Sequence, residues 1–142
     1  MLKGIPAILS PDLLSVLMSM GHGDELVIAD GNFPSASLAR RLLRADGHGV
    51  PPLLEAILPF FPLDSFVPQA AALMAVVPGS TAKTEIWDEY RRILKRHDPA
   101  FGEFQMVERF AFYERARSAY AILATSEKAV YANIILKKGL VA

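Results

Sequence analysis

Apolar residues along the chain form short runs that are separated by glycine, proline and charged residues. Residues 26–29 are an uninterrupted apolar run with Val and Ile at its centre, which is typical of a buried strand. Between residues 84 and 97, by contrast, apolar side chains recur at the spacing of one helix face. The same patterns predict further strands at residues 41–45, 71–77, 105–107, 120–124 and 134–136, and further short helices at residues 53–58 and 110–117.

The first predicted helix is marked at both of its ends. Residues 10–12 combine a serine that can cap a helix, a proline that suits the first helical position and an acid in the first turn. Gly21 then stands where a helix stop belongs. His22 therefore follows directly on a helix end and precedes the strand at residues 26–29.

Strands that alternate with short helices indicate an α/β fold, in which the helices pack on a layered sheet. The chain has 142 residues, enough for one domain with a buried core, so residues 1–142 are interpreted as a single domain. No internal repeat or linker interrupts it. The glycines on either side of His22 lack the spacing of a dinucleotide-binding loop and follow a helix instead of a strand, so no phosphate loop is predicted.

Charge and composition exclude several classes of protein and favour self-association. Lys plus Arg and Asp plus Glu both number 15, so no surface for nucleic acid is expected. Neutral charge with 52% hydrophobic residues is unfavourable for a small monomer, which indicates a homo-oligomer. The absence of cysteine excludes disulfides and thiol catalysis and fits a reducing compartment. Without a signal-peptide pattern or an apolar run of about 20 residues, the protein is expected to be cytoplasmic and to make no membrane contact.

Two polar residues, His22 and Asp30, flank the apolar run at residues 26–29, and both have glycine neighbours. Ligands of α/β proteins bind beyond strand ends, so polar residues in these positions are candidates for a site. A histidine can take or give a proton near neutral pH, and an aspartate can accept hydrogen bonds from hydroxyl groups. The pair therefore suggests cofactor-free acid–base chemistry on a polyol.

Each of these residues also has a simpler interpretation. His22 could be an ordinary loop histidine, and Asp30 could serve only to shape an Asx turn. Together with Asp24 they could bind a metal ion, although their spacing matches no common ligand pattern. One face of the helix at residues 84–97 is predicted to lie in the core or at a subunit contact through Trp87, Tyr90 and Ile93.

Three separated segments of the chain carry a resemblance to known proteins. They are residues 20–25 with their continuation through Asp30 to Pro34, residues 109–116, and residues 131–139, which read MGHGDE, RFAFYERA and YANIILKKG. The three motifs occur in family order, and the resemblance covers nearly the whole chain. On these motifs the chain resembles the family of ribose pyranases and L-fucose mutarotases.

The resemblance implies a sugar mutarotase domain over residues 1–142 that uses no cofactor and no metal. His22 matches the acid–base histidine of the family, and Asp30 matches its substrate-binding aspartate. Further substrate contacts are implied for the other matched residues, Arg109, Tyr131, Ala132 and Asn133. A member of this family would bind a small monosaccharide and form a ring-shaped homo-oligomer, commonly a decamer.

Arg109 bears on which sugar the resemblance implies. The ribose branch of the family usually has histidine at this position, so the arginine resembles the fucose branch, which interconverts the α and β anomers of L-fucose by opening and closing the ring at C1. Two alternatives stay open: a ribose pyranase, which interconverts pyranose and furanose forms, and a non-catalytic sugar-binding ring protein. Arg109 could also form a structural ion pair with Glu108 or Glu114 instead of contacting a sugar.

Overall fold

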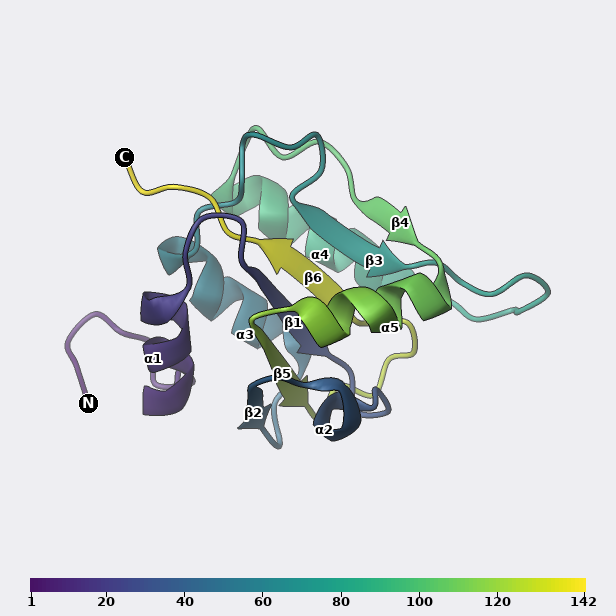
Figure 1. Cartoon of the computed structure of the whole chain (residues 1–142), viewed down its shortest axis with the longest axis horizontal. Coiled ribbons are helices and arrows are strands. Elements are labelled where there is room, and N and C mark those ends of the chain that lie inside the picture. Colours follow the sequence, from purple (N-terminus) through teal and green to yellow (C-terminus); the bar gives the residue numbers. More distant parts are fainter.

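A computed structural model describes residues 1–142 and has the expected α/β architecture (Figure 1). Its centre is one six-stranded sheet with the strand order β2-β5-β1-β6-β3-β4. The strands are β1 (Glu25–Ala29), β2 (Leu42–Ala45), β3 (Ala71–Met74), β4 (Gln105–Val107), β5 (Ala121–Thr125) and β6 (Ile134–Lys137). The helices are α1 (Pro11–Ser19), α2 (Ser35–Leu38), α3 (Val50–Ile57), α4 (Glu85–His97) and α5 (Arg109–Ser118), with a 3₁₀ helix, η1, at Leu58–Phe60. None of these helices has the length and apolar character needed to cross a membrane.

Every strand except β6 runs in the same direction. β1 pairs in parallel with β5, β5 pairs in parallel with β2, and β3 pairs in parallel with β4. β6 lies antiparallel between β1 and β3. The carboxyl ends of the parallel strands therefore meet at one edge of the sheet, where β6 begins. This is the edge at which α/β proteins bind their ligands.

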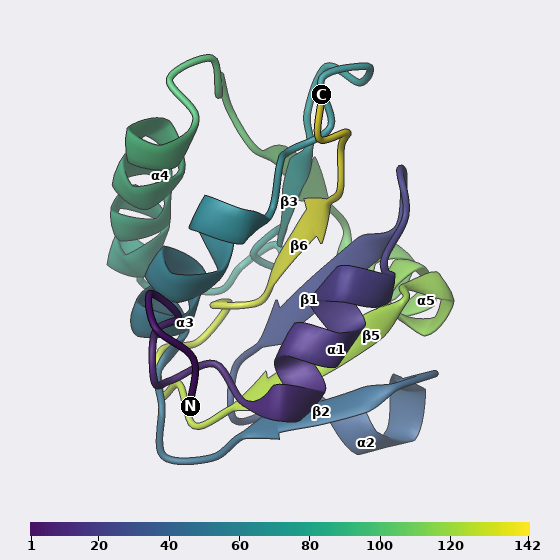
Figure 2. The ribbon, with the colours of Figure 1, turned by 90° about the vertical axis from the view of Figure 1, so that its left-hand side faces the viewer.

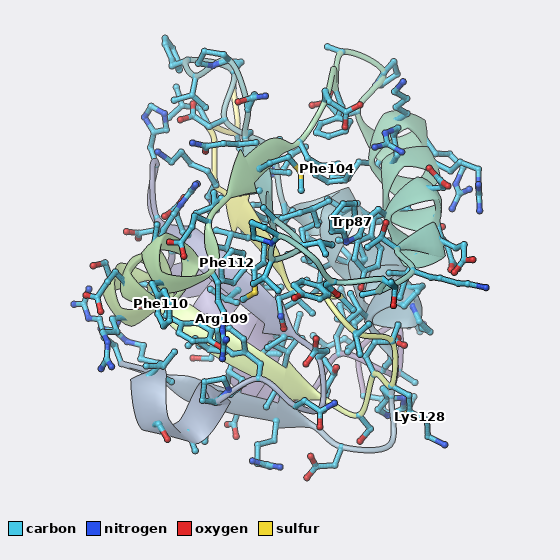
Figure 3. The ribbon with its side chains drawn as sticks, turned by 90° about the vertical axis from the view of Figure 1, so that its right-hand side faces the viewer. Trp87, Phe104, Arg109, Phe110, Phe112 and Lys128 are labelled. Carbon is cyan, nitrogen blue, oxygen red and sulfur yellow. The ribbon has the colours of Figure 1, made fainter.

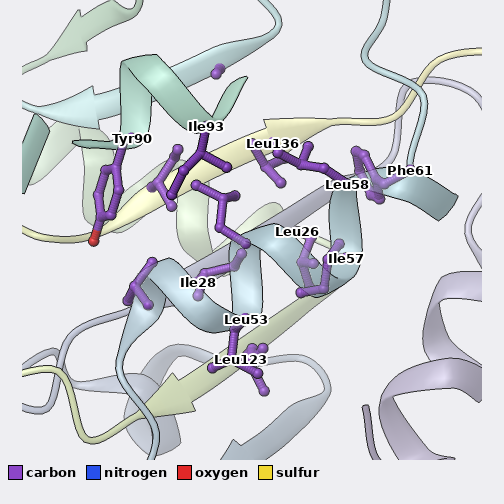
Figure 4. Close-up of a cluster of buried hydrophobic side chains, with 14 of the residues drawn as sticks. Leu26, Ile28, Leu53, Ile57, Leu58, Phe61, Tyr90, Ile93, Leu123 and Leu136 are labelled. Atoms are coloured by element: carbon purple, nitrogen blue, oxygen red, sulfur yellow. The ribbon is translucent and has the colours of Figure 1, made fainter. Parts of the chain in front are cut away.

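Side chains of the sheet alternate between two cores, because successive residues of a strand point to opposite faces. Leu26 and Ile28 of β1 belong to the larger core of 26 buried residues, which α1, α3 and α4 cover (Figure 4). Val27 and Ala29 belong to the smaller core of 11 buried residues, which α2 and α5 cover. Figure 2 shows α3 and α4 on one side of the sheet and α5 on the other.

The strands and helices predicted from the sequence all occur, although some of their bounds differ. β3 ends earlier than predicted, at Met74. The N–H of Ala75 still donates to the Val107 carbonyl of β4 at 2.8 Å, but the N–H of Val77 donates to the Tyr131 hydroxyl at 3.4 Å. α3 begins earlier than predicted, at Val50, because its two prolines occupy the first turn, where no N–H is needed. The four-residue α2 is absent from the prediction because it is too short to show a helical period.

Candidate active site

A cavity of about 160 Å³ opens at the carboxyl edge of the sheet. Four of the residues assigned to a site by the sequence lie in its lining: Asp30, Arg109, Tyr131 and Asn133. Asp30 follows β1, Arg109 begins α5, and the other two precede β6. Ala132 is buried and acts only through its backbone. The cavity is smaller than the roughly 300–1,000 Å³ of drug-sized ligand sites, which favours a small ligand.

Asp30 is the centre of the hydrogen bonding around this cavity. The residue is only 6% exposed. Its Oδ1 accepts from the N–H of Asn32 at 3.0 Å, and its Oδ2 accepts from the N–H of Ala132 at 3.3 Å. Burial raises the pKa of the Asp30 carboxyl, against the lowering effect of these two N–H groups. The Asx-turn interpretation is therefore confirmed, and the same residue also lines the cavity.

Tyr131 and Asn133, two of the substrate contacts implied by the resemblance, both line the cavity and lie just before β6. Tyr131 is the only non-glycine residue with a positive φ, at 53°. Asn133 is 4% exposed, and its Oδ1 accepts a 2.7 Å hydrogen bond from the N–H of Asp30. Its amide nitrogen is thus the group that remains to donate to a ligand.

Arg109 stands at the start of α5, on the rim of the cavity, where Figure 3 shows it beside Phe110. Its Nε donates to the Tyr113 hydroxyl at 3.2 Å. The guanidinium carbon lies 5.4 Å from the ring centre of Phe110 and 5.5 Å from that of Tyr113, within the range of cation–π attraction. These contacts hold the guanidinium near the cavity and leave further N–H groups to donate to a ligand.

The ion-pair interpretation of Arg109 is wrong. Its two candidate partners are otherwise engaged, because Glu108 caps α5 through the N–H groups of the first turn and Glu114 pairs with Arg117. Arg109 itself takes part in no salt bridge in the structure. Its position on the cavity rim thus has no competing structural explanation of this kind.

One wall of the cavity is apolar, and sequence reasoning missed it. Phe33, Met74 and Val130 form this wall together with the ring of Tyr113. Phe33 packs edge-on against Tyr113 with 5.5 Å between ring centres. Tyr113 stands four residues after Arg109 on α5, a spacing that places both on one helix face and could have identified it.

His22 lies at the opposite edge of the sheet from this cavity. It sits in a turn in which the N–H of Gly21 donates to Asp24 Oδ2 at 2.8 Å and the N–H of Asp24 donates to the Gly21 carbonyl at 3.1 Å. β1 separates His22 from Asp30 and alone spans about 13 Å at the usual rise of a strand. The structure thus gathers the predicted sugar contacts in one cavity but leaves His22 outside it.

This separation also excludes the metal site considered from the sequence. His22 and Asp30 lie at opposite ends of β1, so they cannot share an ion with Asp24. No group of three or more His, Asp or Glu side chains in the structure could hold a metal ion. The metal interpretation of these three residues is therefore wrong.

His22 has a carboxylate partner of its own, Asp64, which is 7% exposed. Asp64 Oδ1 lies 3.0 Å from His22 Nε2, and the ring of Phe66 packs against the imidazole with 5.3 Å between ring centres. The N–H of Phe66 donates to the same oxygen, and this bond, followed by the one from His22, holds the pKa of Asp64 below its ordinary value. Because an ionised carboxylate only accepts, Nε2 is the donor and Nδ1 remains available for proton transfer.

The loop that carries Asp64 is fixed by the residues that end β6 and follow it. The N–H of Asp64 donates to the Lys137 carbonyl at 3.0 Å, and the N–H of Gly139 donates to the Pro62 carbonyl at 2.7 Å. A Cβ on Gly139 would lie 2.6 Å from the Leu63 carbonyl oxygen, so only glycine fits this approach. Asp64 belongs to no recognised motif, and no local pattern distinguishes it from other loop aspartates, which is why sequence reasoning missed it.

A family model described as the RbsD / FucU transport protein family matches residues 3–141. The chain belongs to this family. Among RbsD / FucU relatives, the fucose mutarotase of Bos taurus is 52% identical over 148 residues, which cover 99% of this chain and 95% of that protein. The crystal structure of the fucose mutarotase in complex with L-fucose from Streptococcus pneumoniae is 49% identical, with a TM-score of 0.93 over 99% of this chain and 100% of that one. The crystal structure of FucU from Bifidobacterium longum is 52% identical at the same coverage, with a TM-score of 0.96.

Proposed function

We propose that the protein is an L-fucose mutarotase, which interconverts the α and β anomers of L-fucose. The observation that carries this proposal is the cavity of Asp30, Arg109, Tyr131 and Asn133, in a chain about half identical to proteins named fucose mutarotase. Carboxylate, guanidinium, phenol and amide groups all form hydrogen bonds with sugar hydroxyls. The apolar wall suits the methyl group of a 6-deoxy sugar such as L-fucose, since burial of a methyl group is favourable.

The reaction would divide its roles between the two ends of β1. Opening the ring needs one proton delivered to the ring oxygen and one removed from the C1 hydroxyl, and closing on the other face reverses both transfers. We assign proton transfer to Nδ1 of His22, with Asp64 orienting the imidazole through Nε2. Asp30 would accept hydrogen bonds from sugar hydroxyls, while Arg109 would donate them. One well-placed acid–base group contributes about 10²- to 10⁴-fold, which suits a reaction that also proceeds in water.

The distance between these ends leads to a further part of the proposal: each site is shared between two chains. His22 of one chain would complete the cavity of its neighbour. Exposed apolar side chains stand beside both halves: Phe66 (73% exposed) next to His22, Val130 (47%) in the cavity lining, and Phe110 (65%) beside Arg109 at the cavity rim. Exposed apolar surface of this kind is typical of faces that a partner covers. Contacts between unlike surfaces form a ring when the rotation from one chain to the next closes, which fits the ring-shaped decamer implied by the resemblance.

We also propose that the enzyme is cytoplasmic and that it acts on a free monosaccharide without a cofactor. The absence of cysteine from all 142 residues supports a reducing compartment. The chemistry supports the absence of a cofactor, because moving protons between oxygen atoms requires neither an oxidant nor a reductant.

The reaction can be tested by NMR magnetisation exchange between the two anomers of L-fucose. We expect wild type to accelerate the exchange, His22→Ala to leave it at the buffer rate, and His48→Ala, a control at an exposed turn histidine, to resemble wild type. Circular dichroism checks that both variants fold. Exchange at the buffer rate with folded wild type would contradict the proposal.

The same assay distinguishes the two alternatives. Faster catalysis on D-ribose than on L-fucose, seen as pyranose–furanose exchange, would favour a ribose pyranase. A rise in melting temperature with either sugar, without faster exchange, would favour a non-catalytic sugar-binding ring protein.

A further inference from the structure

Two side chains of helix α4 donate hydrogen bonds to the backbone of residues 131–133, the segment that carries Tyr131 and Asn133 into the cavity. The indole N–H of Trp87 donates to the Tyr131 carbonyl at 2.7 Å, and the hydroxyl of Tyr90 donates to the Ala132 carbonyl at 2.7 Å. Trp87 and Tyr90 are three residues apart and therefore share a helix face. Neither residue lines the cavity, so both act on it only through the segment that they hold.

The other side of this segment is bound to Asp30. The N–H of Ala132 donates to Asp30 Oδ2 at 3.3 Å, and Asn133 Oδ1 accepts from the N–H of Asp30 at 2.7 Å. Residues 131–133 are thus fixed between a cavity carboxylate on one side and two aromatic donors on the other. A shift of either support would move the side chains of Tyr131 and Asn133 relative to Asp30.

The backbone of Tyr131 needs such support. Its φ of 53° lies in the left-handed region, which a residue with a side chain rarely adopts unless its surroundings impose it. The bond from Trp87 reaches the carbonyl of this same residue. If the bond were lost, relaxation of the backbone would displace the phenol from the cavity wall.

We propose that Trp87 and Tyr90 are positioning residues for sugar binding, which set the places of Tyr131 and Asn133 in the cavity. This inference rests on the proposed function. Trp87 and Arg109 come from α4 and α5, which cover opposite faces of the sheet (Figure 3). Tyr90 is fully buried in the larger core, where Figure 4 shows its hydroxyl directed toward the chain that precedes β6.

Conservative aromatic variants separate positioning from packing, and Tyr90→Phe in particular removes only a hydroxyl group. Trp87→Phe and Tyr90→Phe each remove one hydrogen-bond donor and keep an aromatic ring. We expect each to raise KM for L-fucose about fivefold, the effect of one net hydrogen bond, and to change kcat much less. The Trp87→Phe Tyr90→Phe double variant should show the larger increase.

Two control variants show whether a general loss of stability raises KM in the same way. Ile93→Val removes a methyl group from the same helix and core at a residue that forms no hydrogen bond with residues 131–133. Tyr120→Phe removes a hydroxyl that forms no hydrogen bond, and it keeps the ring over which the Arg41 guanidinium lies at 4.0 Å. Both should keep the KM of wild type, even where the melting temperature falls. A KM increase in Ile93→Val equal to that in Tyr90→Phe at equal loss of stability would overturn the positioning role.

Trp87 is the only tryptophan of the chain, so its fluorescence reports on this segment alone. Titration with L-fucose should change the emission of wild type in a saturable way, with a midpoint near KM, and Tyr90→Phe should shift that midpoint upward. If wild type catalyses anomer exchange but its emission stays constant and the two Phe variants keep KM, the positioning role is wrong and the proposed function stands. If wild type neither binds nor exchanges L-fucose, the proposed function fails and this inference fails with it.

Discussion

The two ends of strand β1 carry the two halves of the proposed site, and they are built in different ways. At the carboxyl end, Asp30 is 6% exposed, and both oxygens of its carboxylate accept backbone N–H groups. At the amino end, the side chain of His22 is 40% exposed, and Asp64 is its one hydrogen-bonding partner. The first end is a formed cavity without a histidine, and the second is an oriented histidine without a cavity.

This difference supports the proposed separation of sugar binding from proton transfer. Buried, hydrogen-bonded groups hold a fixed geometry, which suits recognition of several hydroxyls at once. An exposed imidazole fixed at one nitrogen can reach a group on another molecule through its second nitrogen. Variants at the carboxyl end should therefore act mainly on KM, and variants at the amino end should act mainly on kcat.

The largest effect on binding is expected for Asp30→Asn. The amide has only one acceptor oxygen, so either Asn32 or Ala132 would lose its acceptor, and the charged acceptor for the sugar is lost as well. We expect kcat/KM for L-fucose to fall about 100-fold, chiefly through KM, and the free energy of unfolding to fall by about 1–3 kcal/mol. Steady-state exchange rates and urea denaturation measure the two effects. Asp46→Asn, at an exposed surface carboxylate, is the control and should change neither.

Asp64→Asn should produce the opposite pattern. The neutral amide can donate to Nε2, which would favour the wrong tautomer of His22 and place the imidazole proton on Nδ1. We expect kcat to fall about tenfold, as for other residues that orient a reactive group, while KM stays close to that of wild type. Asp98→Asn is a matched control, since Asp98 also accepts a backbone N–H two residues on but has no histidine partner. A rise in KM with unchanged kcat would mean that Asp64 belongs to the binding half.

The pH dependence of KM should reveal the burial of Asp30. In the proposed function its ionised form accepts hydrogen bonds from the sugar hydroxyls. Burial raises its pKa, so protonation sets in at a higher pH than for an ordinary carboxyl. Glu127 raises this pKa further through its charge. We expect KM to rise severalfold as the pH falls from about 7 to about 4, whereas Asp30→Asn should show a flat profile. A flat profile in wild type would mean that the ionised carboxylate does not contact the sugar.

The smallest effect is expected for Arg109→Lys. Lysine keeps the charge but loses the planar fork and the bond to the Tyr113 hydroxyl. Because this residue lies on the exposed rim, KM for L-fucose should rise only about threefold. Arg117→Lys, in an exposed pair on the same helix, should leave KM unchanged. Equal effects of the two variants would remove Arg109 from the binding half.

The sequence predicts which residues stand at each end of β1, but it does not predict how the two ends are arranged relative to one another. The apolar run at residues 26–29 identifies the strand, and the matched motifs identify the residues that gather around Asp30. Because the strand lies between them, His22 and Asp30 stand at opposite ends of it, although their residue types suggest a single acid–base site. Partners missed by sequence reasoning are distant along the chain: Asp64 lies 42 residues from His22, and Trp87 lies 44 residues from Tyr131. Neither the hydrophobic periodicity of a segment nor the spacing of residues within a motif predicts contacts between residues so far apart in the sequence.

The most direct test of a site shared between chains is subunit complementation. His22→Ala keeps the cavity but lacks the proton-transfer group, and Asp30→Asn keeps the histidine but has a damaged cavity. The two impaired variants would be unfolded together in equal amounts, refolded as mixed oligomers, and assayed for L-fucose anomer exchange at a sugar concentration well below the KM of Asp30→Asn. We expect recovery of up to about a quarter of wild-type activity, because random pairing joins an intact cavity to an intact His22 in about one contact of four. Mixed oligomers that are no more active than the two variants refolded separately and then combined would contradict the shared site.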